Sequence, residues 1–510
     1  MYKRQEQGND VYENQELPIA ASDVDCILLT HAHIDHSGLI PLMYVNGFRG
    51  QVYSTSATAQ LCEIMLRDSA HIQMFEAEWR NRKAARSGGK LKEFVPLYDM
   101  DAAVNVCKQF VGCEYDRVYD IAEGIKIRFT DVGHLLGSAS IEVWATEKTE
   151  NGDVTEKIVF SGDIGNINKP IIKDPKHVRD ADYVVMESTY GNRSHGGTPN
   201  YVEDLTDIFK RTFERGGNVV IPSFAVGRTQ ELLYIIRKIK EDNLVGRDFD
   251  VYMDSPLAIE ATNIFIKNVE SCFDDEAVEL VRKGINPLSF PGLKYATTGD
   301  ESKQINFDPN PKVIISSSGM CEAGRIRHHL KHNLWRPECT IVFVGYQAVG
   351  TTGRIIVDGA EEIKLFGEPI QIKAEIVQLK GSSGHADKDG LLCWINAFDT
   401  KPKKVFVVHG EDSVCDEFTE CLKEEYGYDA MAPYTGGSYD LIADRVISEG
   451  VKERKTRRTT SIQRGKTVFD RLVAAGKRLM TVITHNEGGT NKDLAKFTDQ
   501  INALCDKWDR

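Results

Sequence analysis

The sequence lacks long hydrophobic runs, paired cysteines and an excess of positive charge. It contains no stretch of about 18 consecutive apolar residues, which excludes an ordinary membrane-spanning helix. Its first residues, MYKRQEQGNDVYENQ, have no apolar core, which argues against a signal peptide. We therefore expect a cytoplasmic protein with no membrane partner.

The cysteines and the net charge exclude further classes. Eleven cysteines are scattered over 510 residues without a CxxC pair, so we expect neither a disulfide framework nor a zinc–thiolate site. The net charge of −13 argues against a protein that coats polyanions through clustered Lys and Arg. A local basic cleft or a metal-bearing site stays open, because bound ions add positive charge that a count of side chains omits.

The organisation of the chain indicates an α/β protein. A chain of 510 residues predicts roughly two to four domains. Short β-branched runs alternate with longer helical patterns, which is typical of α/β folds. We expect a helix over 57–74, a charged connector over 80–92, and a basic linker over 448–466 that precedes C-terminal helices.

A dense group of polar side chains follows the apolar run at residues 26–29. The stretch LLTHAHIDHSGLIP places His31, His33, Asp35 and His36 within six residues. Imidazole nitrogens and carboxylate oxygens are ligands for Zn²⁺. Side chains two residues apart in an extended loop converge, so the two pairs predict two adjacent ion sites. The alternative is a polar loop with surface histidines, which this density at a strand end disfavours.

Three further segments share one local design, in which a polar side chain follows an apolar strand beside a glycine. They are DVGHLLGSAS with His134, VFSGDIG with Asp163 and VFVVHGE with His409. In α/β sheets, functional groups collect at the carboxyl ends of strands. We therefore expect these donors to complete the two ion sites.

The motifs together resemble a known group of enzymes. HAHIDH, GHLLGSA and SGDIG are similar to the metallo-β-lactamase superfamily, and ESTYG, SSGHAD and VHGE resemble its β-CASP nucleases. PSFAVGRTQELL, MDSPLA, SSSGMCEAGRIRHHL and GYQAVGTTGR resemble blocks of the bacterial and archaeal relatives of the cleavage-and-polyadenylation endonuclease. The resemblance runs from about residue 25 to about residue 440. It implies an αββα metallo-β-lactamase sandwich with an inserted α/β β-CASP cap.

The resemblance also implies two zinc ions and their ligands. The first ion would be held by His31, His33 and His134, the second by Asp35, His36 and His409, and Asp163 would bridge both. Two ions about 3.5–4 Å apart with a bridging hydroxide suit in-line displacement at phosphorus. The expected activity is thus zinc-dependent hydrolysis of RNA phosphodiester bonds, as an endonuclease with 5′ exonuclease action as a further mode.

The catalytic residues that we expect are His385, Glu187 and Asp35. His385 would act as general acid toward the leaving 3′ oxygen, since a histidine held by a carboxylate is protonated and oriented. Glu187 is its expected partner, because the family pairs the ESTYG acid with the SGHAD histidine. A metal ligand or a loop cap is the alternative role for His385. Because it has a histidine at position 409, the chain resembles the RNA-cutting members of the family rather than the DNA-repair members.

The expected division of the chain has four parts. Residues 1–199 and 351–445 would form the two pieces of the metallo-β-lactamase domain, 200–350 the cap, and 446–510 the basic linker and helical appendage. Family members usually begin with strands that precede the metal loop, so we expect the N-terminal strands to be missing here.

Single-stranded RNA is the partner that we expect in the cleft between cap and body. Arg228, Ser318 and Ser383 are candidate substrate-binding residues, with turn formation or helix capping as the equal alternative. A second copy of the chain is a further candidate partner. Two other functions stay open, namely a hydrolase of small substrates with the same fold and a catalytically silent RNA-binding protein.

Overall fold

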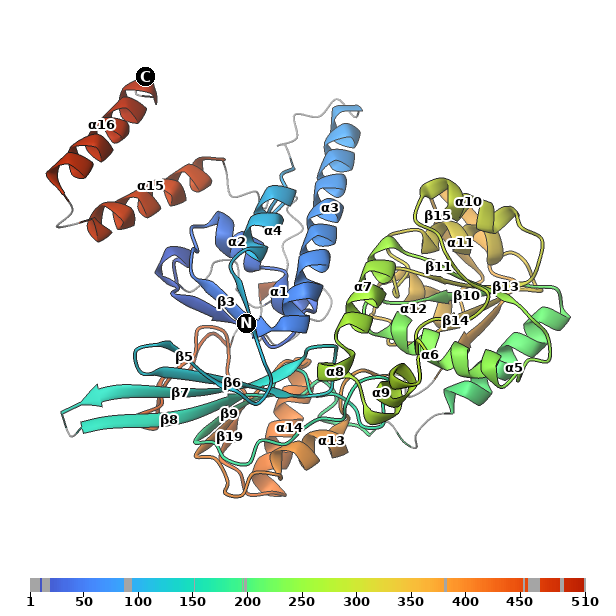
Figure 1. Cartoon of the computed structure of the whole chain (residues 1–510), viewed down its shortest axis with the longest axis horizontal. Coiled ribbons are helices and arrows are strands. Elements are labelled where there is room, and N and C mark those ends of the chain that lie inside the picture. The colour runs from blue at the N-terminus through green and yellow to red at the C-terminus, as the bar shows by residue number, and fades with distance from the viewer. Residues whose placement is uncertain are drawn as a thin grey trace.

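The computed structural model describes residues 10–11, 19–86, 94–150, 152–194, 196, 200–379, 383–452, 455–456, 468–486 and 490–508. Two lobes lie side by side in Figure 1. We call residues 200–379 the cap and residues 19–194 with 383–448 the body. The metal-ligand motifs all lie in the body, and the cap faces them.

The larger sheet of the body has seven strands. Its order is β19 (Ala430–Met431), β18 (Lys404–Val408), β9 (Tyr183–Glu187), β8 (Gly152–Phe160), β7 (Ala139–Thr149), β6 (Ile125–Asp131) and β5 (Val118–Ala122). Strands β5 to β8 are antiparallel, whereas β8, β9, β18 and β19 are parallel. Apolar residues of β9 and β18 pack against α13 (Lys388–Ile395) and α14 (Asp412–Glu424).

The smaller sheet of the body has three parallel strands, β2 (Cys26–Leu28), β3 (Gln51–Thr55) and β4 (Phe110–Cys113). A buried cluster including Phe129 and Ile141 lies between it and the larger sheet. Its outer face is covered by α2 (Ile40–Val45), α3 (Ser56–Arg86) and α4 (Met100–Cys107). Two sheets between two helical layers confirm the predicted αββα sandwich.

The cap is a parallel sheet with helices on both faces. Its six strands are β12 (Leu293–Tyr295), β11 (Asp250–Asp254), β13 (Lys312–Ser316), β10 (Val219–Pro222), β14 (Thr340–Phe343) and β17 (Glu375–Gln378). Along β10, Val219 and Ile221 belong to one core and Val220 to another. This alternation is expected for a strand buried on both faces. The covering helices are α5 (Tyr201–Glu214), α6 (Arg228–Glu241), α7 (Pro256–Lys267), α8 (Val269–Cys272), α9 (Asp275–Arg282), α10 (Gly299–Phe307), α11 (Ile326–Asn333) and α12 (Thr352–Val357).

Two features depart from the sequence predictions. Strand β17, which the predicted division gave to the returning body segment, pairs in parallel with β14 of the cap. Helix α3 continues to Arg86, so the connector predicted over 80–92 was wrong for its first part. Glu76–Arg80 and Glu78–Arg82 are ion pairs four residues apart, a spacing that supports a helix through this charged stretch.

The described part of the chain also contains several shorter elements. They are the 3₁₀ turn η1 (Ala21–Asp23), α1 (Ile34–Ser37), and the strand pairs β15 (Glu362–Leu365) with β16 (Glu368–Gln371), β20 (Ser438–Asp440) with β21 (Arg445–Ser448), and β1 (Asp10–Val11) with β22 (Lys455–Thr456). Much of the predicted basic linker, residues 453–454 and 457–466, lies outside the described residues. The expectation about strands before the metal loop stays a prediction.

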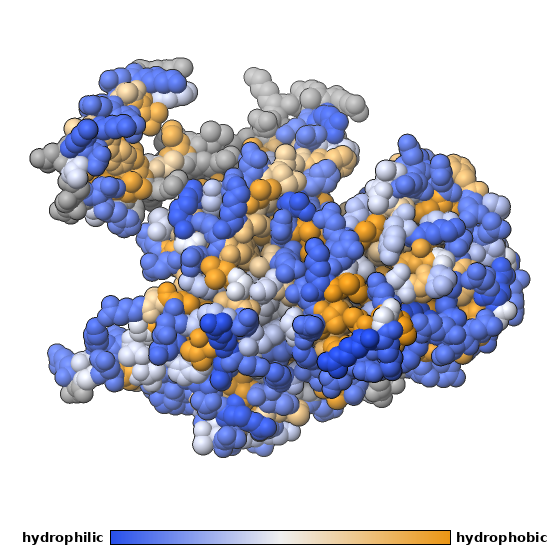
Figure 2. Space-filling view, viewed as in Figure 1, coloured by the Kyte–Doolittle hydropathy of each residue, from blue (hydrophilic) through white to orange (hydrophobic). Residues whose placement is uncertain are grey.

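The surface is mainly hydrophilic on the face in Figure 2. Hydrophobic residues gather there near α8 and α9 and between α15 (Val468–His485) and α16 (Asn491–Trp508). None of the described helices combines the length and apolar character needed to cross a bilayer.

Candidate metal centre

The first loop of the site leaves β2 and enters α1 through a capped turn. The amide of Leu29 donates to the Tyr53 carbonyl at 2.9 Å, which continues the strand pairing beyond β2. His33 is the N-cap residue of α1. The Ser37 hydroxyl donates to the carbonyls of Ala32 and His33 at 2.9 and 3.0 Å. This turn fixes the backbone that carries the four clustered ligands.

The first donor group consists of three histidines and one aspartate. His33 Nδ1 lies 3.1 Å from His31 Nε2 and 3.1 Å from His134 Nε2. Asp163 Oδ2 lies 3.4 Å from His31 Nε2 and 3.6 Å from His134 Nε2. Ligand atoms about 2.0–2.2 Å from a tetrahedral ion are about 3.3–3.6 Å apart. The spacing of this group therefore fits Zn²⁺.

The second donor group lies on the other side of Asp163. His36 Nε2 is 3.1 Å from His409 Nε2 and 3.3 Å from Asp163 Oδ1. His409 Nε2 is 3.3 Å from Asp35 Oδ2 and 3.6 Å from Asp163 Oδ1. All seven predicted ligands thus converge, and each group places its donor atoms within 4.8 Å of one another.

His409 reaches this position through an unusual backbone. Its φ of 55° lies in the left-handed region, which residues other than glycine rarely adopt and which often marks functional sites. A Cβ on Gly410 would lie 2.6 Å from Ser188 Oγ, so this position requires glycine. In the VHGE motif, His409 therefore has a constrained backbone, and Gly410 lies close to Ser188 at the end of β9.

Asp163 supplies the best test of whether the residues fit an ion. Its side chain is fully enclosed, with 1% of the residue exposed. Its Oδ1 accepts no hydrogen bond from the part of the chain that the structure describes. The same Oδ1 lies 3.3 Å from His36 Nε2 and 3.6 Å from His409 Nε2, so a cation between the two groups would complement the charge of this buried carboxylate.

The outer nitrogens of the histidines set the direction of the inner ones. His134 Nδ1 donates to the Gly384 carbonyl at 3.2 Å, and His31 Nδ1 donates to Thr30 Oγ1 at 3.2 Å. His409 Nδ1 donates to Thr189 Oγ1 at 3.1 Å. With the outer nitrogen protonated, the inner Nε2 of a neutral imidazole would direct its lone pair at a bound cation. Such partners are typical of metal-binding histidines.

The pKa values of the histidines in the first group and the pKa of His409 are shifted in opposite directions. Burial lowers the pKa of His33 to about 4 and lowers the pKa values of His31 and His134 well below the usual range. At His409 burial also acts downward, but the charge of Asp163 and the hydrogen bond of Asp35 raise the pKa to about 10. The three histidines of the first group are therefore neutral imidazoles. His409, in the second group, lies in a negative field that a bound cation would neutralise.

His385 and Glu187 form a pair beside the two groups. His385 Nδ1 donates to both Glu187 oxygens at 3.2 Å, and His385 Nε2 lies 3.9 Å from Asp163 Oδ2. Burial alone would lower the pKa of His385, but the charge and hydrogen bonds of Glu187 raise it above its usual value. Glu187 is held in place by the backbone amides of Ile164 and Thr189, at 2.6 and 3.2 Å. This arrangement orients a protonated imidazole toward the donor groups.

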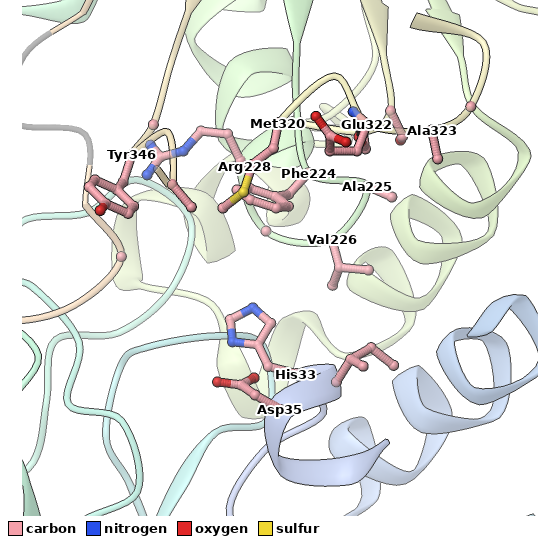
Figure 3. Close-up of a pocket in the computed structure, with 18 of the residues that line it drawn as sticks. His33, Asp35, Phe224, Ala225, Val226, Arg228, Met320, Glu322, Ala323 and Tyr346 are labelled. Atoms are coloured by element: carbon pink, nitrogen blue, oxygen red, sulfur yellow. Dashed lines mark hydrogen bonds between the residues drawn. The ribbon is translucent and has the colours of Figure 1, made fainter. Parts of the chain in front are cut away.

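A cleft of about 2500 Å³ opens in front of these groups. Figure 3 shows His33 and Asp35 on its body side and Phe224, Arg228 and Tyr346 on its cap side. The cleft thus runs between the two lobes, past the donor groups.

The three predicted substrate-binding residues all line this cleft. Arg228 begins α6 and its Nη1 lies 2.5 Å from Glu231 Oε2. Ser318 Oγ accepts a hydrogen bond from the Glu322 amide at 3.2 Å, and Ser383 Oγ accepts one from the His385 amide at 3.1 Å. Both serines therefore form turns as well as facing the cleft, and their contact with substrate stays a prediction.

Sequence reasoning missed several supporting residues. Lys169, whose side chain is 10% exposed, donates to the His134 carbonyl at 2.8 Å, with its Nζ 3.4 Å from Glu231 of the cap. Thr189, in the ESTYG motif, contacts His409 as described above. The only sequence signal was that both lie within or just after quoted motifs.

A second buried histidine–carboxylate pair lies within the cap. His329 Nε2 donates to Asp254 Oδ2 at 2.6 Å, and His329 Nδ1 donates to Asn306 Oδ1 at 3.0 Å. Asp254 also accepts hydrogen bonds from Ser302 and Arg325, each at 2.6 Å. This network joins β11, α10 and α11, and its members Asp254 and Arg325 line the cleft.

Comparison with protein families gives two matches. Residues 229–356 match the Beta-Casp domain. Residues 369–433 match the Zn-dependent metallo-hydrolase RNA specificity domain.

Individual relatives cover most of the chain. It is 34% identical over 390 residues to ribonuclease TTHA0252 of Thermus thermophilus, covering 76% of this chain and 82% of that protein. It is 31% identical over 392 residues to the RNase J-like protein of Methanocaldococcus jannaschii, with 76% and 82% covered. It is 32% identical over 421 residues to transcription termination factor FttA of Methanosarcina mazei, covering 81% of this chain but only 62% of that factor.

Proposed function

This chain belongs to the β-CASP ribonuclease family of metallo-β-lactamase-fold hydrolases, and on that premise we propose that it hydrolyses single-stranded RNA with two zinc ions. One observation carries the proposal. Two donor groups share the buried carboxylate of Asp163, beside the His385–Glu187 pair and in the wall of a cleft. A nuclease needs this combination, whereas a small substrate does not need a leaving-group acid from a separate motif.

The seven donor residues would bind the two ions in two sets. His31, His33 and His134 would hold one ion, Asp35, His36 and His409 the other, and Asp163 would contact both. When bound, a pair of zinc ions lowers the pKa of a shared water and neutralises charge on the phosphate. Asp35 would therefore be a catalytic residue, because it would bind one of the two ions at the reacting centre.

His385 would supply the proton for the leaving group. A bond forms from a water oxygen to phosphorus, the bond from phosphorus to the 3′ oxygen breaks, and the proton of His385 Nε2 moves to that oxygen. The attacking water gives up one proton to the solvent, and His385 regains one from the solvent before the next cycle. Glu187 keeps the imidazole protonated through its charge and its contacts at 3.2 Å with Nδ1. The products are a 5′-phosphate and a 3′-hydroxyl.

We further propose that the inserted cap comprises residues 200–379, with the returning body segment beginning near residue 380. The parallel pairing of β17 with β14 supports this boundary over one at residue 350. Arg228, Ser318 and Ser383 would contact the RNA backbone on the two sides of the cleft.

The test uses purified protein, its zinc content and two RNA substrates. We expect cleavage of a labelled linear single strand and of a circular single strand, since only internal cutting opens a circle. Cleavage of the linear strand alone, releasing nucleotides from the 5′ end, would replace the endonuclease proposal by an exonuclease. RNA binding without any cleavage would support a silent RNA-binding protein and overturn the proposal.

A matched pair of variants links the activity to the site. Asp163→Asn is expected to remove cleavage and zinc, whereas Asp153→Asn, on the exposed end of β8, is expected to change neither. Cleavage that survives in Asp163→Asn would come from another site or a contaminant and would overturn the proposal.

A further inference from the structure

We propose that Phe366, at the tip of the β15–β16 hairpin, is a stacking platform for a base of single-stranded RNA. The inference rests on the proposed function for the class of substrate. It adds a binding residue on the cap side of the cleft, away from the motifs that carry the metal centre.

The backbone at Phe366 is the first observation. Leu365 pairs with Glu368, so Phe366 and Gly367 form a two-residue loop with φ of 53° and 88°. Such loops favour Asn-Gly, because both residues must adopt the left-handed conformation. A phenylalanine there is sterically unfavourable, and strain of this kind is retained mainly where a side chain has a function.

The surroundings of the ring are the second observation. The strand residues Ile363 and Leu365 are buried, and so fill the core beneath the hairpin, whereas Phe366 is 46% exposed. The ring is stacked on His328, with centroids 4.4 Å apart and planes at 26°. The guanidinium of Arg327 lies 5.0 Å from the ring centroid. The ring is therefore supported from α11 while a large part of it stays open.

The position in the cleft is the third observation. Phe366, Arg327 and Lys364 line the same cleft as His33 and His385. Exposed aromatic rings beside cations are the usual platform for single-stranded nucleic acid, since each base has a π face and each nucleotide a phosphate. The acidic Glu368 of the hairpin has its carboxylate 2.9 Å from Lys331 Nζ, so its charge is compensated.

The experiment measures binding of the full chain to single-stranded oligoadenylate that carries one 2-aminopurine per strand. We expect quenching of the fluorophore on binding, and about 10-fold weaker binding for Phe366→Ala. Phe366→Trp is expected to restore affinity. Phe366→Asn is expected to bind as weakly as Phe366→Ala although Asn suits the left-handed turn, which separates stacking from folding.

A matched control is available on the same lobe. Phe307 is 77% exposed and its ring lies 6.2 Å from that of His332, but it does not line the cleft. Phe307→Ala is therefore expected to bind RNA as the wild type does.

The outcomes separate the inference from the proposed function. Wild-type cleavage with unchanged binding in both Phe366→Ala and Phe366→Asn would overturn the inference alone. RNA binding that depends on Phe366 without cleavage would support the inference and overturn the nuclease. Equal weakening by Phe307→Ala would show a general surface effect and overturn the inference.

Discussion

Two histidine–carboxylate pairs in the described part of the chain, one in the body and one in the cap, have different surroundings. In the body, His385 donates to Glu187 at 3.2 Å through Nδ1, and its Nε2 faces Asp163 at 3.9 Å. In the cap, His329 donates to Asp254 at 2.6 Å and uses its second nitrogen for Asn306 at 3.0 Å. The side chain of His385 is 21% exposed and that of His329 is 0% exposed.

The contacts of the second imidazole nitrogen distinguish a reactive histidine from a structural one. Both imidazoles are oriented by an acid, but both nitrogens of His329 are engaged by oxygen atoms of the cap itself. The second nitrogen of His385 points toward the donor groups and the cleft, where a substrate oxygen would lie. The orientation of the second nitrogen, rather than the acid, therefore distinguishes the two pairs.

The largest effect is expected for a substitution of Asp163, the carboxylate that His385 faces. Asp163→Asn takes a shared charge from both donor groups. We expect zinc to be lost and RNA cleavage to fall below detection, since even residues behind metal ligands cost about 10- to 100-fold when removed. Metal analysis and single-turnover cleavage check this. A variant with full zinc and activity would mean that Asp163 is not shared between ions.

The next effect concerns the body pair itself. His385→Ala is expected to slow cleavage by about 100- to 10,000-fold, the range for loss of a general acid, with zinc content unchanged. His177→Ala, which changes an exposed histidine on the loop before β9, is the control and should retain the wild-type rate. Loss of zinc in His385→Ala would instead make His385 a metal ligand.

The cap pair should respond in stability rather than rate. His329→Ala leaves the buried Asp254 without one of its partners, and we expect the free energy of unfolding of the cap to fall by about 3 kcal/mol. Urea denaturation measures this loss, while cleavage at low temperature by the folded fraction should stay within about 3-fold of the wild type. A loss of rate without a loss of stability would make the two pairs alike.

The smallest effect is the response of the cap pair to acid. Burial would raise the pKa of Asp254, but hydrogen bonds from His329, Ser302 and Arg325 together lower it. A carboxyl with a lowered pKa in the folded state adds stability above its unfolded pKa of about 3.9, and this stability is lost as the pH falls below that value. Asp254→Asn should therefore give a less pH-dependent unfolding free energy between pH 5 and about 3. An unchanged slope would contradict this linkage.

The sequence predicted the body site better than the cap, for a physical reason. His31, His134, Asp163 and His409 each follow a strand and lie beside a short turn, so local signals mark them. The seven-donor cluster then follows from strands that end at one edge of the fold.

The features that sequence reasoning missed depend on distant partners. Asp254 and His329 are 75 residues apart and meet only in the folded cap. Phe366 stands out only once its φ and its contact with His328 are known. Strand β17 lies after the predicted boundary at residue 350, and its pairing with the cap strand β14 has no local signature in the sequence. The length of α3 was missed for another reason, because the composition of this stretch is typical of a connector although ion pairs four residues apart support a helix.

The most direct test of the central claim is a zinc titration of metal-free protein, followed by the rate of single-stranded RNA cleavage. Two donor groups that share Asp163 predict that the rate rises until two zinc ions per chain are bound and then stays constant. Full cleavage in the presence of a chelator, or a rate that is independent of added zinc, would contradict the account.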